Sequence, residues 1–342
     1  MTDTVQPDER GIARAVAVLR SGGLVAFPTE TVYGLGADAL NAEAVRKIFA
    51  AKGRPANDPL IVHVDTVDSM RNLVRSVPDV VPALASRFWP GPLTLVLPRS
   101  AEVPDEVSAG LETVAIRIPS HPVARRLLAA ARMPIAAPSA NLFSRPSPTR
   151  PEHVLEDLDN RIDLLLDGGP TPVGVESTVL DLSGLYPTIL RPGAVTLEML
   201  RGVTPTVRLR DTRTADDEPL RSPGLLDKHY APRAPLTLYE GHGQAVIDRI
   251  VRDRRAAAAA GKRVGIIAAD DDPIDGDDVM HVGAEHDADA VAASLYAALR
   301  QLDANGVDLI LARGFPAHSG LGVAIQDRLR RAAAGNIVAV AS

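Results

Sequence analysis

Apolar residues in the N-terminal part of the chain occur either at helical spacing or in short continuous runs. Residues 8–21 repeat them at helical spacing and end at a glycine pair, and residues 42–52 form a second predicted helix between Asn41 and Gly53. Because many strands follow with helices irregularly between them, we expect a curved mixed sheet with flanking helices. The predicted strands are LVAF, LIVHV, LTLVL, TVAIRI, PIAAPS, IDLLLD, STVLDL and TILRPG, with helical stretches near 66–88 and 121–132.

The pattern changes after residue 202. Residues 203–235 are rich in charge and proline and have no sustained period, so we predict a linker there. Residues 236–342 alternate strands and helices in the order of a small parallel sheet. We therefore expect two domains, 1–202 and 236–342, joined by a linker at 203–235.

Composition and charge narrow the class of protein. The 342 residues are 46% hydrophobic, and no run approaches the roughly 18 apolar residues of a membrane span. There is no cysteine, which excludes disulfides and thiolate chemistry, and the polar N-terminus is unlike a secretory signal, so we expect a cytoplasmic protein. Residues 1–202 carry 20 Lys and Arg against 23 Asp and Glu, a balance that disfavours non-specific nucleic-acid binding.

Several segments resemble known functional motifs but lack a defining residue or spacing. GLGADA (34–39) and GHGQAV (241–246) lack the third glycine of a dinucleotide fingerprint and are predicted tight turns. The acidic run at 270–278 lacks calcium-loop spacing and is predicted to be a solvated loop. Ser139 has no nucleophile elbow around it, so we interpret it as a hydrogen-bonding ligand. The histidines have no metal-binding spacing, so no protein metal site is predicted.

Polar side chains instead gather at the ends of predicted strands and in the loops after them, where α/β proteins usually bind ligands. Arginines and a lysine could converge there on an anion, while hydroxyl and amide groups orient it. For any single residue, pairing with a local carboxylate is an equally good interpretation. The residues are Thr29, Thr31, Lys52, Arg54, His63, Arg117, Ser139, Asn141, Ser177, Thr178 and Arg191.

Taken together, these segments resemble the threonylcarbamoyl-AMP synthase family, which has a YrdC-like fold. The similar segments span residues 24–195 in the family's order, and SPGLLDKHYAP (222–232) resembles the linker motif of the longer form with a small Rossmann-like C-terminal domain. The resemblance implies that L-threonine, bicarbonate and ATP give threonylcarbamoyl-AMP and pyrophosphate. The segments are FPTETVYGLGADA, KGRPANDPLIVHV, FWPGPLTLVL, AIRIPSHP, PIAAPSANLFSRPSPT, ESTVLDL and ILRPGAV.

The same resemblance implies roles for individual residues. Lys52 and Arg54 match a catalytic pair that meets the nucleotide phosphates and the carbamate. Positions that hold threonine and the carbamate are matched by Thr31, His63, Arg117 and Ser177. Nucleotide-binding positions are matched by Lys52, Arg54, Asn57, Thr113, Ser139, Asn141, Arg191 and Tyr230. Mg²⁺ is expected with ATP, without a dedicated protein site, and a downstream tRNA threonylcarbamoyl transferase complex is the expected partner.

Elementary chemistry agrees with a cationic pair. A carbamate attacking an α-phosphate brings two anions together, so the catalyst must supply positive charge and in-line positioning. We expect Lys52 and Arg54 to reach one face of an extended segment, stiffened by Pro55 and Pro59. Because the product is a labile mixed anhydride, we also expect residues 222–232 to cover the site as a lid.

Two alternatives stay open. One is an RNA-binding module of YrdC-like fold, although the negative charge of residues 1–202 leads us to expect only weak tRNA binding. The other is a carbamoyl transferase that uses carbamoyl phosphate, which should need neither bicarbonate nor threonine.

Overall fold

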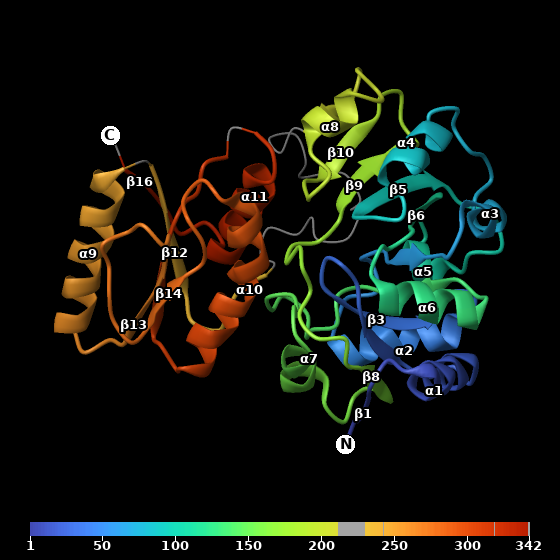
Figure 1. Ribbon diagram of the computed structural model, residues 1–342, viewed down its shortest axis with the longest axis horizontal. Coiled ribbons are helices and arrows are strands. Elements are labelled where there is room, and N and C mark those ends of the chain that lie inside the picture. Colours follow the sequence, from blue (N-terminus) through green and yellow to red (C-terminus); the bar gives the residue numbers. More distant parts are fainter. Residues whose placement is uncertain (211–229, 242, 318, 341–342) are drawn as a thin grey trace. The chain divides into compact units, whose positions relative to one another are not determined.

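The computed structural model describes residues 1–210, 230–241, 243–317 and 319–340 (Figure 1). The chain divides into two compact units. The first comprises residues 1–143 and 148–225, and the second comprises Ser144–Ser147 together with residues 226–342. The C-terminal unit thus includes four residues that lie, in sequence, within the N-terminal part of the chain.

The N-terminal unit is built on one mixed sheet of eleven strands in the order β1-β8-β2-β3-β7-β4-β6-β5-β9-β10-β11. This confirms the predicted mixed sheet with flanking helices. The strands are β1 (Asp3–Val5), β2 (Val25–Pro28), β3 (Tyr33–Asp38), β4 (Ile61–His63), β5 (Leu93–Pro98), β6 (Thr113–Arg117), β7 (Ile135–Ala136), β8 (Leu164–Leu166), β9 (Thr178–Asp181), β10 (Thr188–Arg191) and β11 (Arg208–Leu209). The helices are α1 (Glu9–Arg20), α2 (Ala42–Lys52), α3 (Val67–Met70), the 3-10 turn η1 (Arg71–Leu73), α4 (Val81–Phe88), α5 (Asp105–Ser108), α6 (Pro122–Ala131), α7 (Pro151–Leu158) and α8 (Leu197–Arg201).

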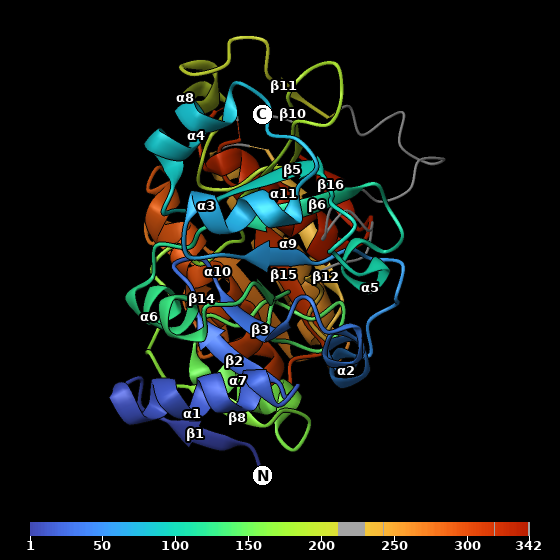
Figure 2. The same ribbon diagram turned by 90° about the vertical axis from the view of Figure 1, so that its right-hand side faces the viewer.

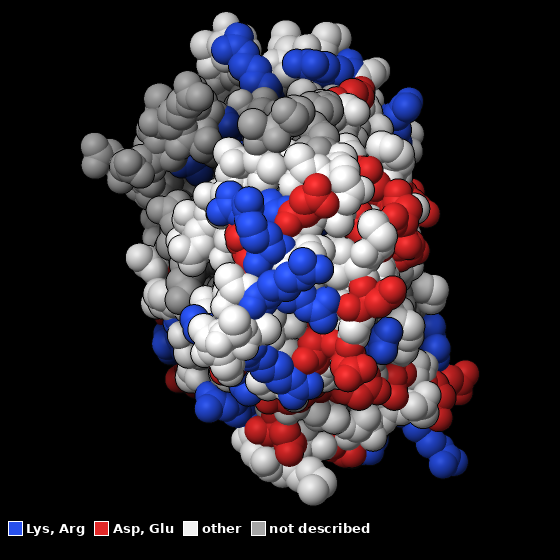
Figure 3. All heavy atoms as spheres, turned by 90° about the vertical axis from the view of Figure 1, so that its left-hand side faces the viewer, with Lys and Arg blue, Asp and Glu red and all other residues white. Residues whose placement is uncertain are grey.

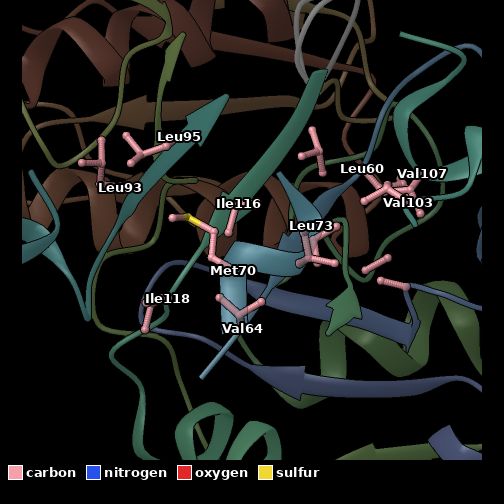
Figure 4. Packing of buried hydrophobic residues seen from close by; sticks show 14 of the residues in the cluster. Leu60, Val64, Met70, Leu73, Leu93, Leu95, Val103, Val107, Ile116 and Ile118 are labelled. Carbon is pink, nitrogen blue, oxygen red and sulfur yellow. The ribbon is translucent and has the colours of Figure 1, made fainter. Parts of the chain in front are cut away.

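Apolar side chains cover the sheet in two separate clusters. In one, α1 and α6 pack against β2 and β8 through residues such as Leu19, Phe27 and Leu127 (Figure 2). The larger cluster joins α2 and α4 to the central strands, and Figure 4 shows part of it, including Met70, Leu95 and Ile116. Burial of both clusters fixes the positions of the strand ends that carry the candidate site.

Two predictions about this unit were wrong. GLGADA is not a tight turn, because Gly34 and Gly36 lie inside β3. A Cβ atom at Gly36 would come within 2.8 Å of both Ile135 and Phe27, so close packing and not a turn requires glycine there. The predicted linker also contains β11, which pairs in parallel with β10.

The C-terminal unit is a five-stranded parallel sheet in the order β14-β13-β15-β12-β16, which confirms the predicted parallel α/β fold. Its strands are β12 (Leu236–Glu240), β13 (Val264–Ala268), β14 (Val279–His281), β15 (Leu309–Arg313) and β16 (Ile337–Ala339), and its helices are α9 (Gln244–Ala259), α10 (Ala288–Ala304) and α11 (Gly322–Ala333). The acidic run is not simply solvated. Asp272 and Asp278 are buried, and they pair with Arg313 and Arg263.

Within the described ranges, no helix is long and apolar enough to cross a bilayer.

Candidate active site

The parallel pairing of β4 and β6 places His63 directly beside Arg117 at the carboxyl ends of the two strands. On the other side of β6, Thr94 of β5 pairs with Arg117 in the antiparallel register. Residues in register on one face lie within contact distance. Three polar side chains therefore gather on adjacent strands within a largely apolar sheet.

Arg117 is held in place by groups from two other segments. Its Nη2 lies 2.7 Å from Oε1 of Glu30, its Nη1 donates to Oγ1 of Thr31 at 2.9 Å, and its Nε donates to the carbonyl oxygen of Gly91 at 3.3 Å. The other oxygen of Glu30 accepts from the backbone N–H of Ser120 at 3.0 Å. Burial raises the pKa of Glu30, but the charge and hydrogen bond of Arg117 outweigh it, so the pKa is lowered and the pair is ionised.

His63 is the least satisfied polar group of this cluster. Its side chain is buried, and neither ring nitrogen has a hydrogen-bond partner among the described residues. Burial, and then the charge of Arg117, lower its pKa to about 3, so the imidazole is neutral near pH 7. A buried ring with an unused donor and an unused acceptor is suited to hydrogen-bond a ligand.

Lys52 lies at the end of α2, not on an extended segment, and the prediction about its backbone was therefore wrong. Gly53 follows it with φ 62°, the left-handed conformation that ends many helices. The Nζ of Lys52 donates to the carbonyl oxygen of Asn141 at 2.6 Å and to that of Ser139. Lys52 thus ties the end of α2 to the loop after β7, where two predicted nucleotide ligands lie.

Arg54 forms a buried ion pair with Asp58. The Nη2–Oδ2 distance is 2.9 Å, and Nη2 also donates to the carbonyl oxygen of Pro59 at 3.0 Å. Burial raises the pKa of Asp58, against the opposing charges of Arg54, Lys52 and Arg191. Arg54 contacts this carboxyl directly, and the convergence of Lys52 and Arg191 on the same site stays a prediction.

Ser177 joins the two clusters. Its Oγ hydrogen-bonds Oγ1 of Thr94 at 2.7 Å and accepts from Nη2 of Arg191 at 3.2 Å. Thr94 lies beside Arg117 in the sheet register, so Ser177 links Arg191 to the strand that neighbours Arg117. Sequence reasoning missed Glu30, Asp58 and Thr94, although all three lie within the quoted motifs.

The remaining predicted residues lie less centrally. Asn57 is exposed, and Thr113 lies at the opposite end of β6 from Arg117. Tyr230 belongs to the C-terminal unit, where it is buried against Tyr296 and beneath the guanidinium of Arg328. Most of the predicted lid, residues 222–229, lies outside the described residues.

The described residues offer no ready cage for Mg²⁺. Within those ranges, no three His, Asp or Glu side chains are placed to share a metal ion. Asp58, the carboxyl beside Lys52 and Arg54, is already paired with an arginine. The donor set therefore fits an anionic ligand better than a bare cation.

A mixed α/β sheet whose strand ends carry buried polar and cationic side chains is typical of a small-molecule enzyme, and comparisons with known proteins identify the family. The Sua5/YciO/YrdC family, described as "Telomere recombination", matches residues 17–193, and the family "Threonylcarbamoyl-AMP synthase, C-terminal domain" matches residues 195–334. The chain belongs to the threonylcarbamoyl-AMP synthase family.

Individual relatives match over nearly the whole chain. The Threonylcarbamoyl-AMP synthase of Bacillus subtilis is 45% identical over 99% of this chain and 97% of its own length. That of Pyrococcus abyssi is 43% identical over 97% of each chain. A crystal structure of P. abyssi Sua5 complexed with L-threonine matches with a TM-score of 0.93 and 42% identity, covering 100% of this chain and 99% of the other.

Proposed function

We propose that the protein makes threonylcarbamoyl-AMP from L-threonine, bicarbonate and ATP. The observation that carries the proposal is the adjacency of two unlike clusters joined through Ser177. One contains a fixed guanidinium, hydroxyl groups and a neutral imidazole, and the other contains three cations. Family membership and 43–45% identity to named synthases over the whole chain point the same way.

The first cluster suits threonine. The remaining N–H groups of Arg117 can donate to the α-carboxylate, while Glu30 keeps the guanidinium oriented. His63 has a free donor or acceptor for the side-chain hydroxyl of the substrate. A neutral imidazole adds no second positive charge, so at this end of the site the charged side chains are those of Arg117 and Glu30.

The second cluster suits the triphosphate. The threonine amine and bicarbonate give a carbamate and water, and a carbamate oxygen then attacks the α-phosphorus as the bond to pyrophosphate breaks. Lys52, Arg54 and Arg191 would offset the negative charge on the phosphate oxygens, since phosphoryl transfer relies on positioning and electrostatic stabilisation. Mg²⁺ carried by the phosphates of ATP would screen further charge.

Pyrophosphate release with each substrate omitted in turn tests the proposal. Release should need ATP, L-threonine and bicarbonate together. Equal release without threonine would overturn it, and pyrophosphate release from ATP with carbamoyl phosphate in place of threonine and bicarbonate would favour a carbamoyl transferase.

Delivery of the product to a tRNA threonylcarbamoyl transferase complex is part of the same proposal, because a mixed anhydride is too labile to store. The alternative of an RNA-binding module gains little from the charge pattern. The face in Figure 3 carries acidic as well as basic side chains, and the net charge is −6. Binding of tRNA at physiological salt without any pyrophosphate release would favour that alternative.

A further inference from the structure

The N-terminal unit contains a cavity of about 500 Å³ between α3, η1, α4 and the residue after β6. Its walls are mainly apolar and include Met70, Val81, Trp89 and Ile118. The volume lies within the range of about 300–1,000 Å³ that is usual for small-molecule sites. None of the residues assigned above to threonine or ATP lines it.

This cavity and the Arg117 end of the candidate active site lie on opposite sides of the chain at residues 117–118. Ile118 directly follows Arg117, and successive residues of an extended chain point to opposite sides. Trp89 and Pro90 form part of the cavity wall, and the next residue, Gly91, donates its N–H to the carbonyl oxygen of Ile118 at 2.8 Å. The carbonyl oxygen of Gly91 accepts from Arg117 Nε. Residues 89–91 therefore touch both sites.

The polar lining favours an anion. The lining contains two arginines, Arg71 and Arg125, and one carboxylate, Asp65, whose Oδ1 already accepts from Ser69 Oγ at 2.6 Å. Within the described part of the chain, no carboxylate pairs with Arg125, whose Nη1 donates to a backbone oxygen. The ion pair of Arg71 with Asp68 is exposed, and pairs of that kind are weak.

The apolar lining favours a compact ring or branched chain. The indole N–H of Trp89 donates to the carbonyl oxygen of Leu93 at 2.6 Å, so its polar atom is already satisfied within the protein. A ligand that meets this ring therefore meets hydrocarbon, which suits aromatic or aliphatic groups.

We propose that this cavity is an effector site for a small organic anion, an apolar body with one carboxylate or sulfonate, and that its occupancy changes the affinity for threonine through residues 89–91. The effect on threonine rests on the proposed function, whereas the binding does not. A protein segment with an apolar side chain is the rival occupant.

The single tryptophan of the chain, Trp89, gives a direct readout of occupancy. The full-length protein is titrated with 8-anilinonaphthalene-1-sulfonate, following energy transfer from Trp89, and with the uncharged N-phenyl-1-naphthylamine in parallel. We expect one saturable site for the sulfonate. Arg125→Gln should weaken it by about tenfold or more and leave the uncharged probe unaffected, because one charge-assisted hydrogen bond is lost. Arg126→Gln, the neighbouring arginine on α6 that does not line the cavity, should bind as the wild type does.

Ala85→Leu provides the second test, because it fills the cavity from a buried wall position. Ala85→Leu should abolish energy transfer from Trp89 to the sulfonate probe, while circular dichroism shows an unchanged fold. Saturating sulfonate should shift the KM for threonine in the wild type, not in Ala85→Leu, and leave the KM for ATP unmoved. Equal sulfonate affinity in Arg125→Gln and Arg126→Gln would overturn the anion site. An unmoved threonine KM at full occupancy would overturn the effector role, and binding of apolar peptides in preference to both probes would assign the cavity to a protein partner.

Discussion

Lys47 and Lys52 lie on the same helix, and both donate from Nζ to backbone carbonyl groups. Of the two, only Lys52 has a charge that lowers the pKa of the Asp58 carboxyl. Lys47 donates to Gly22 at 2.6 Å, far from any predicted ligand, whereas Lys52 donates to Ser139 and Asn141. The two residues therefore form a matched pair for separating a catalytic role from a structural one.

We predict that Lys52→Ala lowers turnover by about two to three orders of magnitude, as expected for a lost contact that stabilises transition-state charge. Lys47→Ala should keep turnover and lose only stability. Pyrophosphate release and thermal unfolding of both variants are the measurements. If both variants lost activity in proportion to their stability, Lys52 would be a structural residue alone.

Glu30 is a positioning residue for Arg117. Glu30→Gln keeps the shape of the side chain and removes the charge of a buried ion pair 2.7 Å long. We predict a rise in the KM for threonine of about tenfold, with the KM for ATP little changed, because the guanidinium loses its fixed orientation. Asp163→Asn is the control, since Asp163 accepts from the backbone N–H of Leu24 away from Arg117. A parallel rise in both KM values would remove Glu30 from the threonine end.

His63 should make the N-terminal unit sensitive to acid. Its pKa is about 3 in the folded protein against 6.5 in the unfolded chain, so between these values the unfolded state binds the extra proton and stability falls as pH falls. We predict that the wild type loses about 1 kcal/mol of stability per pH unit more than His63→Gln between pH 6 and pH 4. Urea unfolding followed by Trp89, which lies in the N-terminal unit, measures the difference, and the exposed His286→Gln serves as control. Identical slopes in wild type and His63→Gln would show that His63 is protonated in the folded state.

At the scale of elements, the backbone of the turn after β10 packs closely against the backbone at the start of β9. An ideal Cβ at Gly193 would lie 2.4 Å from the backbone nitrogen of Thr178 and 2.6 Å from the carbonyl oxygen of Glu176. These atoms flank Ser177, whose hydroxyl joins the two clusters. The glycine thus permits the close approach of two backbones at the centre of the site.

We predict that Gly193→Ala costs about 1–3 kcal/mol of stability through overpacking and also lowers kcat, because Ser177 must shift. Gly184→Ala, in the turn between β9 and β10, should change neither, since its nearest neighbour is 4.0 Å away. Denaturant unfolding and pyrophosphate release check both. Normal kcat in a destabilised Gly193→Ala protein would separate this packing from the chemistry.

Element patterns in the sequence predicted most helices and strands, and they failed where tertiary contacts decide. β3 was missed because glycine is required at position 36 by close contacts with Phe27 of β2 and Ile135 of β7, which the local sequence does not reveal. The end of α2 at Lys52 and the left-handed Gly53 after it were predicted correctly, but the extended segment expected to carry both Lys52 and Arg54 does not include Lys52. The partner of Arg117 was missed for the same reason: Glu30 pairs with it across 87 positions of sequence, which no local pattern reveals.

At the scale of the whole molecule, the sequence indicated two α/β parts, but it could not show that Ser144–Ser147 belong with the second unit. In that unit, Arg300 donates to the carbonyl oxygen of Pro146 at 2.6 Å and the N–H of Ala231 donates to that of Ser144 at 2.7 Å. The chain enters this segment directly from the loop that contains Ser139 and Asn141. The C-terminal unit therefore holds the four residues that come next in the chain after a loop with two candidate nucleotide ligands.

This connection predicts a remote effect of Arg300, which is buried in the C-terminal unit. Arg300→Ala should lower kcat by about 10- to 100-fold and raise the KM for ATP more than that for threonine, because a small misplacement of a positioned group is costly. Arg300→Lys, which keeps a donor for Pro146, should recover part of the loss. Arg313→Ala is the matched control: it removes another buried arginine of the same unit, but one that pairs with Asp272 and Glu285 and has no bond to residues 144–147. If Arg313→Ala reproduced the rise in the KM for ATP, general destabilisation of the C-terminal unit, not the lost bond to Pro146, would explain both variants.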